Sequence, residues 1–202
     1  MRSCKNKETN EIFAVKIFRS DDEEMFIHAE REFKILERLK GNRNIIQGVD
    51  YIPEFLRSRG YIVMEKIDGN HLLNFAFENG PVSEEEAKTI ARQIIEAVRF
   101  MHERGVVHRD MNPTNVFIVD EKTKFVKLLD FNISKLVDES KSSRHGSIDQ
   151  IDAEEEIKHQ SGEKKEKVSM SIENDRTKYS MFTKTGTPIY SAPEIHTSFR
   201  YT

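Results

Sequence analysis

The sequence contains very little cysteine and no long hydrophobic run. Cys4 is the only cysteine in 202 residues, which excludes an intrachain disulfide and is typical of a reducing compartment. No apolar stretch approaches the roughly 20 residues of a membrane-spanning helix, and the first residues lack the apolar core of a signal peptide. We therefore expect a soluble intracellular protein with no membrane partner, cytoplasmic in the first instance and nuclear as the alternative.

A strong charge of either sign is also missing. The 32 Lys and Arg residues nearly balance the 35 Asp and Glu residues, which leaves a formal net charge of −3. This gives no reason to expect nucleic acid or an anionic membrane surface as a partner. With 37% hydrophobic and 33% charged residues, the chain is expected to fold into one or two globular domains, and its oligomeric state is left open.

Aromatic residues are absent from residues 138–178. Nearly half of the positions in this range are charged, and Ser and Gln fill much of the rest. Such a composition cannot bury enough apolar surface to offset the entropy of ordering the chain. We predict a disordered segment here, with folded structure on both sides of it.

Hydrophobic spacing predicts strands and helices elsewhere. Residues 11–18, preceded by a short first strand, and residues 44–52 and 61–67 are expected to be strands. One helix should follow the acidic residues 21–24 and end at Gly41, and another should begin with the capping box of Ser83 and Glu86 and end near Gly105. The stripes expected to face the core are Met25, Ala29, Phe33, Leu36 and Leu39 in the first helix, and Ala87, Ile90, Ala91, Ile94, Val98 and Met101 in the second.

The stretch from His108 to Asn132 carries the most specific chemical pattern. Two apolar runs, 116–119 and 125–129, predict a hairpin, with Asp110 and Asn115 before it and Asp130 after it. Each acid taken alone is more simply a solvated loop residue. The ordered set resembles the catalytic loop H-R-D-L-x-x-x-N and the D-F-G magnesium motif of the eukaryotic protein kinases.

Three further segments carry the same resemblance. Residues 14–17 (A-V-K-I) are similar to the kinase V-A-I-K strand, residues 61–69 to the strand and hinge between the kinase lobes, and residues 185–194 to the end of an activation segment, G-T-P-x-Y-x-A-P-E. The resemblance implies an α+β, two-lobed fold, with a partial N-terminal lobe at 1–67, a partial C-terminal lobe at 68–202 and the disordered insertion 138–178 inside the activation segment. It also implies truncation at both ends, because the chain begins after the point where the glycine-rich loop should lie and stops eight residues beyond Glu194.

The resemblance assigns the phosphate-binding lysine and its partner. Lys16 would hold the α- and β-phosphates of ATP, fixed by a glutamate of the first helix. We choose Glu32 over the competing acids Glu30 and Glu37, because residues 35–36 follow Glu32 at the matching offset. A lysine in an apolar strand otherwise points to solvent about as often as not.

The remaining catalytic roles fall on the His108–Asn132 stretch. Asp110 would accept the proton of the substrate hydroxyl, and Asn115 and Asp130 would offer oxygen ligands to Mg²⁺. His108 is expected to have a structural role, as its counterpart in the family does. The cofactors implied are ATP and Mg²⁺.

The adenine ring would be held by five residues. By resemblance Ala14 forms the roof of this site and Phe117 its floor, and Met64 is the gatekeeper residue. The backbone groups of Glu65 and Ile67 would bond the edge of the adenine.

Regulation is expected to act through the activation segment. Arg109 makes the catalytic loop similar to that of kinases in which this arginine receives a phosphate. Thr183 is the expected phosphorylation site because it lies three residues before Gly186, and Thr185 is the alternative.

Four residues depart from the family pattern. Asn132 replaces the glycine of D-F-G, and Asn tolerates the positive φ of such a turn. Asn112 stands where a lysine usually steadies the transferred phosphate, so transfer should be slower. His71 and Thr114 stand where arginine-directed kinases carry acids, which gives no support to a preference for basic substrates.

These residues predict an ATP-dependent protein serine/threonine kinase that acts on Ser/Thr hydroxyls of a protein substrate. The alternatives are a pseudokinase-type module that binds nucleotide or a partner without phosphoryl transfer, and an incomplete product with no independent function. We expect the chain by itself to transfer phosphate poorly, because a glycine-rich loop and later helices would be missing.

Overall fold

The computed structural model describes residues 1–19, 23–137 and 185–197. The chain divides into two compact units, residues 1–136 and residues 137–202, and each is described by itself. The predicted insertion 138–178 and Thr183 lie outside the described residues. In the part of the chain that is described, no helix is long and apolar enough to cross a membrane.

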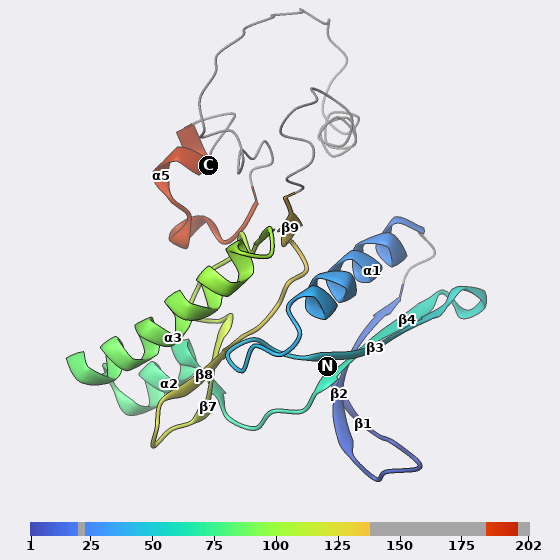
Figure 1. Cartoon of the computed structure of the whole chain (residues 1–202), viewed down its shortest axis with the longest axis horizontal. Helices are drawn as coiled ribbons and strands as arrows, with labels where there is room; N and C mark the ends of the chain where they lie inside the picture. Colours follow the sequence, from blue (N-terminus) through green and yellow to red (C-terminus); the bar gives the residue numbers. More distant parts are fainter. Residues whose placement is uncertain (20–22, 138–184, 198–202) are drawn as a thin grey trace, which may run out of the picture. The chain divides into compact units, whose positions relative to one another are not determined.

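The first unit begins with a four-stranded antiparallel sheet in the order β1-β2-β4-β3 (Figure 1). Its strands are β1 (Arg2–Lys5), β2 (Ile12–Arg19), β3 (Gly48–Glu54) and β4 (Arg59–Glu65). A short 3-10 helix, η1 (Phe55–Arg57), turns the chain from β3 to β4. The prediction for β2 is correct within one residue, whereas the strand predicted at 44–52 begins only at Gly48. Residues before Gly48 form a loop instead.

Helix α1 (Glu23–Arg38) packs against β3 and β4. Ala29, Leu36 and Leu39 of the predicted stripe are buried, but Met25 is 44% exposed. Phe26 takes its place, because its ring meets Phe18 edge-on at 5.4 Å and contacts Phe55 at 4.8 Å. The apolar stripe therefore starts one residue later than predicted.

The loop of residues 41–47, between α1 and β3, is tied down by polar side chains. The Gln47 amide donates to the carbonyls of Asn42 and Ile45 and accepts from the N–H of Gly41. Asn44 donates to the carbonyl of Val126 at 2.7 Å. Ile45 is fully buried. This loop is therefore part of the core.

The rest of the first unit combines two helices with two small sheets. The helices are α2 (Leu72–Asn79) and α3 (Glu84–His102). One sheet has the order β5-β7-β8, and β6 pairs with β9; these strands are β5 (Asn70–His71), β6 (Val106–Val107), β7 (Val116–Asp120), β8 (Phe125–Leu128) and β9 (Lys135–Leu136). The hairpin predicted after the catalytic loop is thus confirmed as β7 and β8. In α3, Ile90 and Met101 are buried as predicted. Ala91, which was expected to face the core, is exposed, and Ala97, which was not, is buried.

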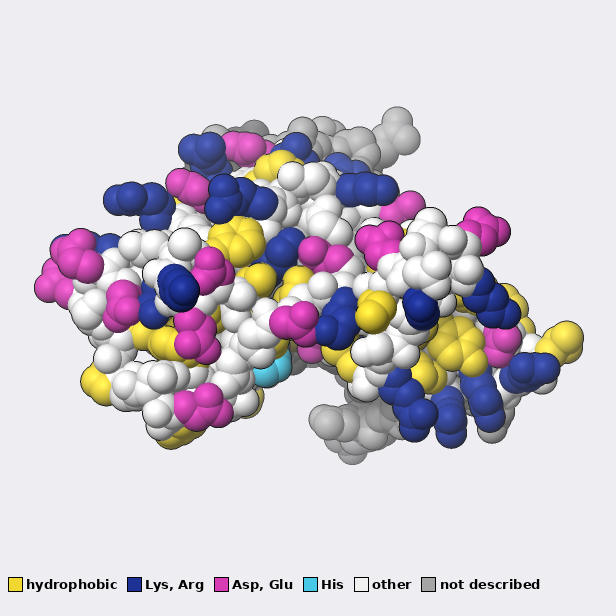
Figure 2. Space-filling view, turned by 90° about the horizontal axis from the view of Figure 1, so that it is seen from below, with side chains coloured by type: hydrophobic (Ala, Val, Ile, Leu, Met, Phe, Trp, Pro, Cys, Tyr) yellow, Lys and Arg dark blue, Asp and Glu magenta, His cyan; other side chains and the backbone are white. Residues whose placement is uncertain are grey.

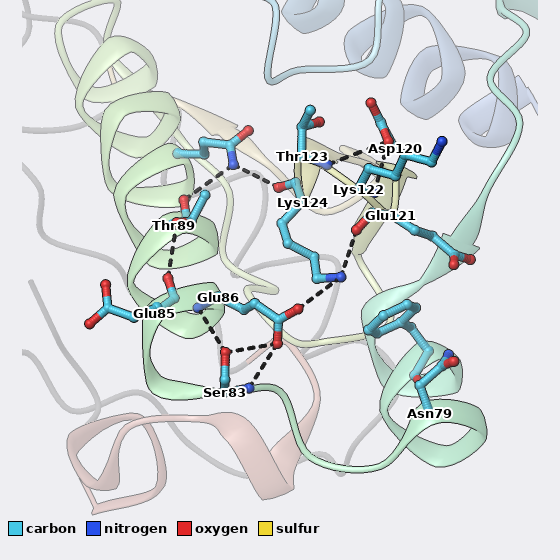
Figure 3. A network of polar contacts seen from close by, with 12 residues as sticks. Asn79, Ser83, Glu85, Glu86, Thr89, Asp120, Glu121, Lys122, Thr123 and Lys124 are labelled. Atoms are coloured by element: carbon cyan, nitrogen blue, oxygen red, sulfur yellow. Dashed lines mark hydrogen bonds and ion pairs between the residues drawn. The ribbon is translucent and has the colours of Figure 1, made fainter.

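The N-terminus of α3 is locked by the predicted capping box (Figure 3). The Ser83 hydroxyl accepts from the N–H of Glu86, and the Glu86 carboxylate accepts from the N–H of Ser83 at 2.9 Å. Lys124, in the turn between β7 and β8, lies 3.0 Å from the same carboxylate and 4.9 Å from the centre of the Phe75 ring. The hydrogen bond from the Ser83 backbone, then Lys124, lowers the pKa of Glu86 to about 2. Helix α3 is therefore joined to the β7–β8 turn.

Charge is distributed unevenly over the first unit (Figure 2). Lys and Arg side chains gather at the right-hand end, over the hairpins β1–β2 and β3–β4, whereas the rest of the visible face carries both basic and acidic side chains. Arg19 and Arg59 are directly opposite each other across β2 and β4, and both are exposed. Facing like charges weaken strand pairing unless solvent screens them. This end of the sheet is therefore a solvated one.

In the second unit, the described residues 185–197 contain the 3-10 helix η4 (Pro188–Tyr190) and helix α5 (Pro193–Thr197). The Ser191 hydroxyl donates to the carbonyl of Thr187 at 3.1 Å, which closes the turn around η4. This is the segment that resembles the end of a kinase activation segment.

Candidate active site

Lys16 projects from β2 toward two carboxylates. Its ammonium lies 2.8 Å from both oxygens of Glu32 on α1 and 3.3 Å from Asp130, which follows β8. Neither competing acid binds Lys16 in the described structure, since Glu30 pairs with Lys34 and Glu37 is exposed. The predicted pairing of Lys16 with Glu32 is confirmed.

The ion pair is largely shielded from water. The Glu32 side chain is 6% exposed and the Lys16 side chain 34%. Burial raises the pKa of Glu32, and Lys16 opposes this rise. Burial acts to lower the pKa of Lys16, but the attraction of Glu32, then of Asp130, outweighs it, so this pKa is raised. Lys16 therefore stays a cation that is aimed by fixed carboxylates.

The catalytic loop holds its acid with an amide. The Asn115 Nδ2 group donates both to the backbone carbonyl of Asp110, at 2.9 Å, and to its carboxylate, at 2.8 Å. Both N–H bonds of this amide are used, so its Oδ1 atom is left to face a ligand. The Asn115 carbonyl accepts from the N–H of Leu129, which fixes the loop to the end of β8.

His108 supports the loop from inside the protein. Its Nε2 atom lies 3.0 Å from the Leu129 carbonyl, and its Nδ1 atom accepts from the N–H of Asp110 at 3.3 Å. Since a carbonyl can only accept, Nε2 carries the hydrogen. Burial lowers the pKa of His108, so the ring stays neutral. These bonds suit the structural role that was expected for this residue.

The backbone around Asp130 differs from the expectation for Asn132. Asp130 has φ of 58° and Arg109 has φ of 67°, whereas Asn132 is not among the described non-glycine residues with positive φ. Asp is one of the residues that enter this region most readily. The left-handed position of the turn is therefore taken by Asp130, and the tolerance of Asn132 for positive φ is not used.

Asn112 turns into the loop rather than toward a ligand. It is 6% exposed, and its Oδ1 atom accepts from the N–H of Thr114 at 2.8 Å and from the Thr114 hydroxyl at 2.5 Å. The side chain thus closes a local turn.

The residues present fit a magnesium ion. Asp130 offers a carboxylate that is 42% exposed, and Asn115 offers the amide oxygen left over from its bonds to Asp110. No cluster of three His, Cys, Asp or Glu residues suited to a metal occurs in residues 1–19, 23–137 or 185–197. Mg²⁺ is commonly bound by only one or two protein oxygens together with phosphates and water, so a sparse site of this kind matches it.

Two of the proposed adenine residues, Ala14 and Met64, lie on one face of β2 and β4. Ala14 is directly opposite Met64 and therefore shares a face with it, and Met64 is buried. Phe117 lies on β7, where its ring contacts that of His71 edge-on at 5.1 Å. Ile67 lies in the linker between β4 and β5, half-buried.

The linker requires glycine at one position. Gly69 has φ of 144°, and a Cβ atom there would lie 2.0 Å from the carbonyl oxygen of Ile118. Only glycine allows the linker to approach β7 so closely.

Comparison with known proteins decides the family. A family profile described as the protein kinase domain matches residues 1–202. The chain belongs to the protein kinase family. The resemblance drawn from the motifs and the α+β kinase fold class are therefore confirmed.

The kinase domain is similar to several curated protein kinases. It is 40% identical over 111 residues to calcium/calmodulin-dependent protein kinase type 1 of Caenorhabditis elegans, which is 54% of the chain and 31% of that protein. It is 33% identical over 150 residues to a putative ribosomal protein S6 kinase alpha-2 of the same organism, which is 73% of the chain and 19% of that protein. It is 30% identical over 134 residues to MAP kinase-interacting serine/threonine-protein kinase 2 of Xenopus laevis, which is 66% of the chain and 28% of that protein. The matched segments thus span less than a third of each relative.

One buried ion pair of the kinase domain was not predicted. Lys127 on β8 is 8% exposed, and its ammonium lies 2.6 Å from the Glu65 carboxylate, which also accepts from the N–H of Gln47. The signal in the sequence is a lysine inside the apolar run 125–129. A lysine in an apolar strand usually points to solvent by alternation, so this signal alone does not predict burial.

The regulatory residues are only partly placed. Arg109 donates from Nε to the carbonyl of Ile133 at 2.5 Å. Thr185 is half-buried in the second unit, and Thr183 lies outside the described residues. Their regulatory roles stay predictions.

Proposed function

We propose that this kinase domain transfers the γ-phosphate of ATP to Ser or Thr hydroxyls of a protein substrate. The observation that carries the proposal is the position of the Lys16 ammonium, 2.8 Å from Glu32 and 3.3 Å from Asp130. Three residues far apart in the sequence meet here, and one is a cation suited to phosphate.

Lys16 serves as the point charge for the α- and β-phosphates. Glu32 fixes the direction of the ammonium, and it is held in place by its own burial. Because the amine stays protonated, its charge is available over the whole physiological pH range.

Asp110 serves as the acceptor of the substrate proton. Its carboxylate is oriented by the Asn115 amide, which donates to Oδ2 at 2.8 Å. Asp130 and Asn115 would hold Mg²⁺, which when bound neutralises charge on the phosphates. Ala14, Met64 and Phe117 would enclose the adenine, and the backbone groups of Glu65 and Ile67 would bond its edge.

A second function is favoured by Asn112. This residue directs its oxygen into the loop and carries no charge, so it cannot steady the transferred phosphate. A site of this kind binds nucleotide but transfers phosphate slowly or not at all, as a pseudokinase module would.

Two substitutions separate the roles and the two functions. We expect Asp130→Asn to lower the Mg²⁺-dependent affinity for ATP by about tenfold or more, because it removes a metal ligand's charge. Asp110→Asn should leave this affinity within about twofold and abolish transfer, because Asp110 acts on the acceptor. Affinity is measured by calorimetry with and without Mg²⁺, and transfer with radiolabelled ATP and a generic protein substrate.

Asp68→Asn is the matched control, because the Asp68 side chain is 89% exposed and pairs with Lys66 outside the proposed site. Equal loss of affinity in the Asp110 and Asp130 variants would contradict the assigned roles. Binding of ATP without any transfer that depends on Asp110 would favour the module that binds without catalysis.

A further inference from the structure

Helices α1 and α3 are joined by one side chain. Arg38, in the last turn of α1, donates from Nε to the backbone carbonyl of Arg104 at 2.6 Å. Arg104 follows the end of α3, and its own N–H donates to the carbonyl of Met101 at 2.9 Å, so the acceptor belongs to the final turn of that helix. We call the bond between Arg38 and Arg104 the α1–α3 tie.

The tie gives Arg38 a partner other than an acid. Arg38 is exposed, and in the described part of the chain it forms no ion pair with a carboxylate. The last carbonyls of a helix lack partners within the helix and carry the negative end of its dipole, so a guanidinium bound there stabilises the helix end. Because the donor is charged, the bond is stronger than one between neutral groups.

The tie connects two halves of the candidate active site. In the α1 half, α1 carries Glu32 and packs against the sheet whose strand β2 carries Lys16. In the α3 half, the chain runs from Arg104 through β6 into the catalytic loop with Asp110, and this loop is bonded to the end of β8, which Asp130 follows. The contact of Lys16 with Asp130, at 3.3 Å, therefore spans the two halves.

The tie gives the C-terminal end of α1 a second attachment to the α3 half. Its other attachment is the 41–47 loop, which is bonded to β8. A helix held by a loop alone can rotate about that point, whereas a second point fixes its direction. Glu32 lies six residues from Arg38, about 9 Å along the axis, so a rotation of about 10° moves it by roughly 1.5 Å. If the packed sheet follows, Lys16 leaves hydrogen-bond distance of Asp130.

We infer that Arg38 is a positioning residue of the active site. Through the α1–α3 tie it fixes the direction of α1 and so holds Lys16 and Glu32 at their observed distance from Asp130. Its effect on ATP rests on the proposed function, in which Lys16 meets the phosphates from one half and Asp130 serves the metal from the other. When the tie is lost, open arrangements of the two halves become populated, and the affinity for Mg-ATP falls by the same factor as the closed fraction.

The test measures the distance between the halves without nucleotide. One nitroxide is placed on Cys4 of β1, which is exposed, and a second on Ala91→Cys, an exposed position of α3. Electron–electron double resonance then gives the distribution of distances. Arg38→Met removes the donor and keeps nearly the same helix propensity. We expect it to lower the ratio of closed to open forms by about threefold or more, the size expected for one exposed charged contact, and saturating Mg-ATP should restore the original distribution.

Two further variants make the test specific. Arg99→Met is the matched control, because it removes an arginine of the last turn of α3 that pairs with the exposed Glu103 and leaves the tie in place. It should keep the original distribution. Arg38→Lys keeps a charged donor and should retain most of the closed form. A thermal transition for each variant shows that it is folded, and Arg38→Ala takes the place of Arg38→Met if the latter does not fold.

The inference is overturned if Arg38→Met keeps the original distribution, or if Arg99→Met changes it as much. Calorimetry with Mg-ATP supplies the second readout. A loss of affinity in Arg38→Met that exceeds the loss of the closed form would also overturn it, because Arg38 would then act by another route. If no form of the chain binds Mg-ATP, the proposed function fails, and the distances recorded without nucleotide still decide whether Arg38 sets the arrangement of the two halves.

Discussion

Lys16→Met should destabilise the folded chain by about 2–3 kcal/mol at pH 7. Removing one partner of a buried ion pair costs about 3–5 kcal/mol, because the other charge is left without a partner. Here the Glu32 side chain is 6% exposed but that of Lys16 is 34% exposed, so solvent screens the pair and we reduce the expected cost to about 2–3 kcal/mol. Glu32→Gln should cost less, about 1 kcal/mol, because Lys16 keeps Asp130 and some solvent.

The pH dependence of this loss tests its cause. Burial raises the pKa of Glu32, and Lys16 is the group that opposes the rise. In Lys16→Met the folded chain therefore holds a proton on Glu32 more readily than the unfolded chain, so lowering the pH from 7 toward 5 should restore part of the lost stability. Glu32→Gln has no carboxyl here and should show no such recovery.

The measurement is urea unfolding of the wild type, both single variants and the double variant at pH 7 and pH 5. The double variant should be less destabilised than the sum of the single variants, because the two groups are in contact. Lys34→Met is the matched control, because it removes an exposed pair between Lys34 and Glu30 on α1, the helix that carries Glu32. This change should lower the free energy of unfolding by less than about 0.5 kcal/mol. An equal cost for Lys16→Met at both pH values, or a larger cost for Glu32→Gln, would refute the argument.

Three further outcomes are expected. Glu86→Gln should lower stability at pH 7, and its difference from the wild type should disappear as the pH falls from about 4.5 to 2 in acid unfolding, because the lowered pKa of Glu86 stabilises only the ionised form; a constant difference would contradict this. Gly69→Ala should lower the thermal midpoint and cost about 2 kcal/mol or more, since its Cβ would meet the Ile118 carbonyl; an unchanged midpoint would contradict this. Thr183→Ala should lower both phosphorylation and activity of the protein in cells, and the regulatory site lies elsewhere if neither changes.

Local spacing and motif order predicted much of the active site. Glu32 could be chosen as the partner of Lys16 because both the position of the helix and the offset of the following apolar residues pointed to it. Asp110 and Asn115 were predicted to act together because Asn115 follows Asp110 by five positions, as in the motif H-R-D-L-x-x-x-N, and the structure joins them by two hydrogen bonds. The Asp110–Asn115 contact lies within one motif, and the Lys16–Glu32 pairing follows from the order in which the family's motifs occur along the chain.

The features that were not predicted depend on contacts between distant segments. Phe26 replaces Met25 in the core because Phe18 and Phe55 lie against it. Lys127 is buried because Glu65, 62 residues earlier, comes within 2.6 Å. The residue with positive φ is Asp130 rather than Asn132, and propensity alone does not distinguish two neighbouring residues that both tolerate it.

The 41–47 loop has a consequence for how the kinase domain can be altered. Connections between elements are usually the places where a chain accepts an insertion, a cut or a new terminus, because their backbone is bonded to water. Here the N–H of Ile46 donates to the carbonyl of Leu128, and the N–H of Leu128 donates to the carbonyl of Asn44. A segment that a designer would choose first for splitting the protein into two fragments is therefore one of the worst places to divide it, and the exposed turn between β1 and β2 is the better choice.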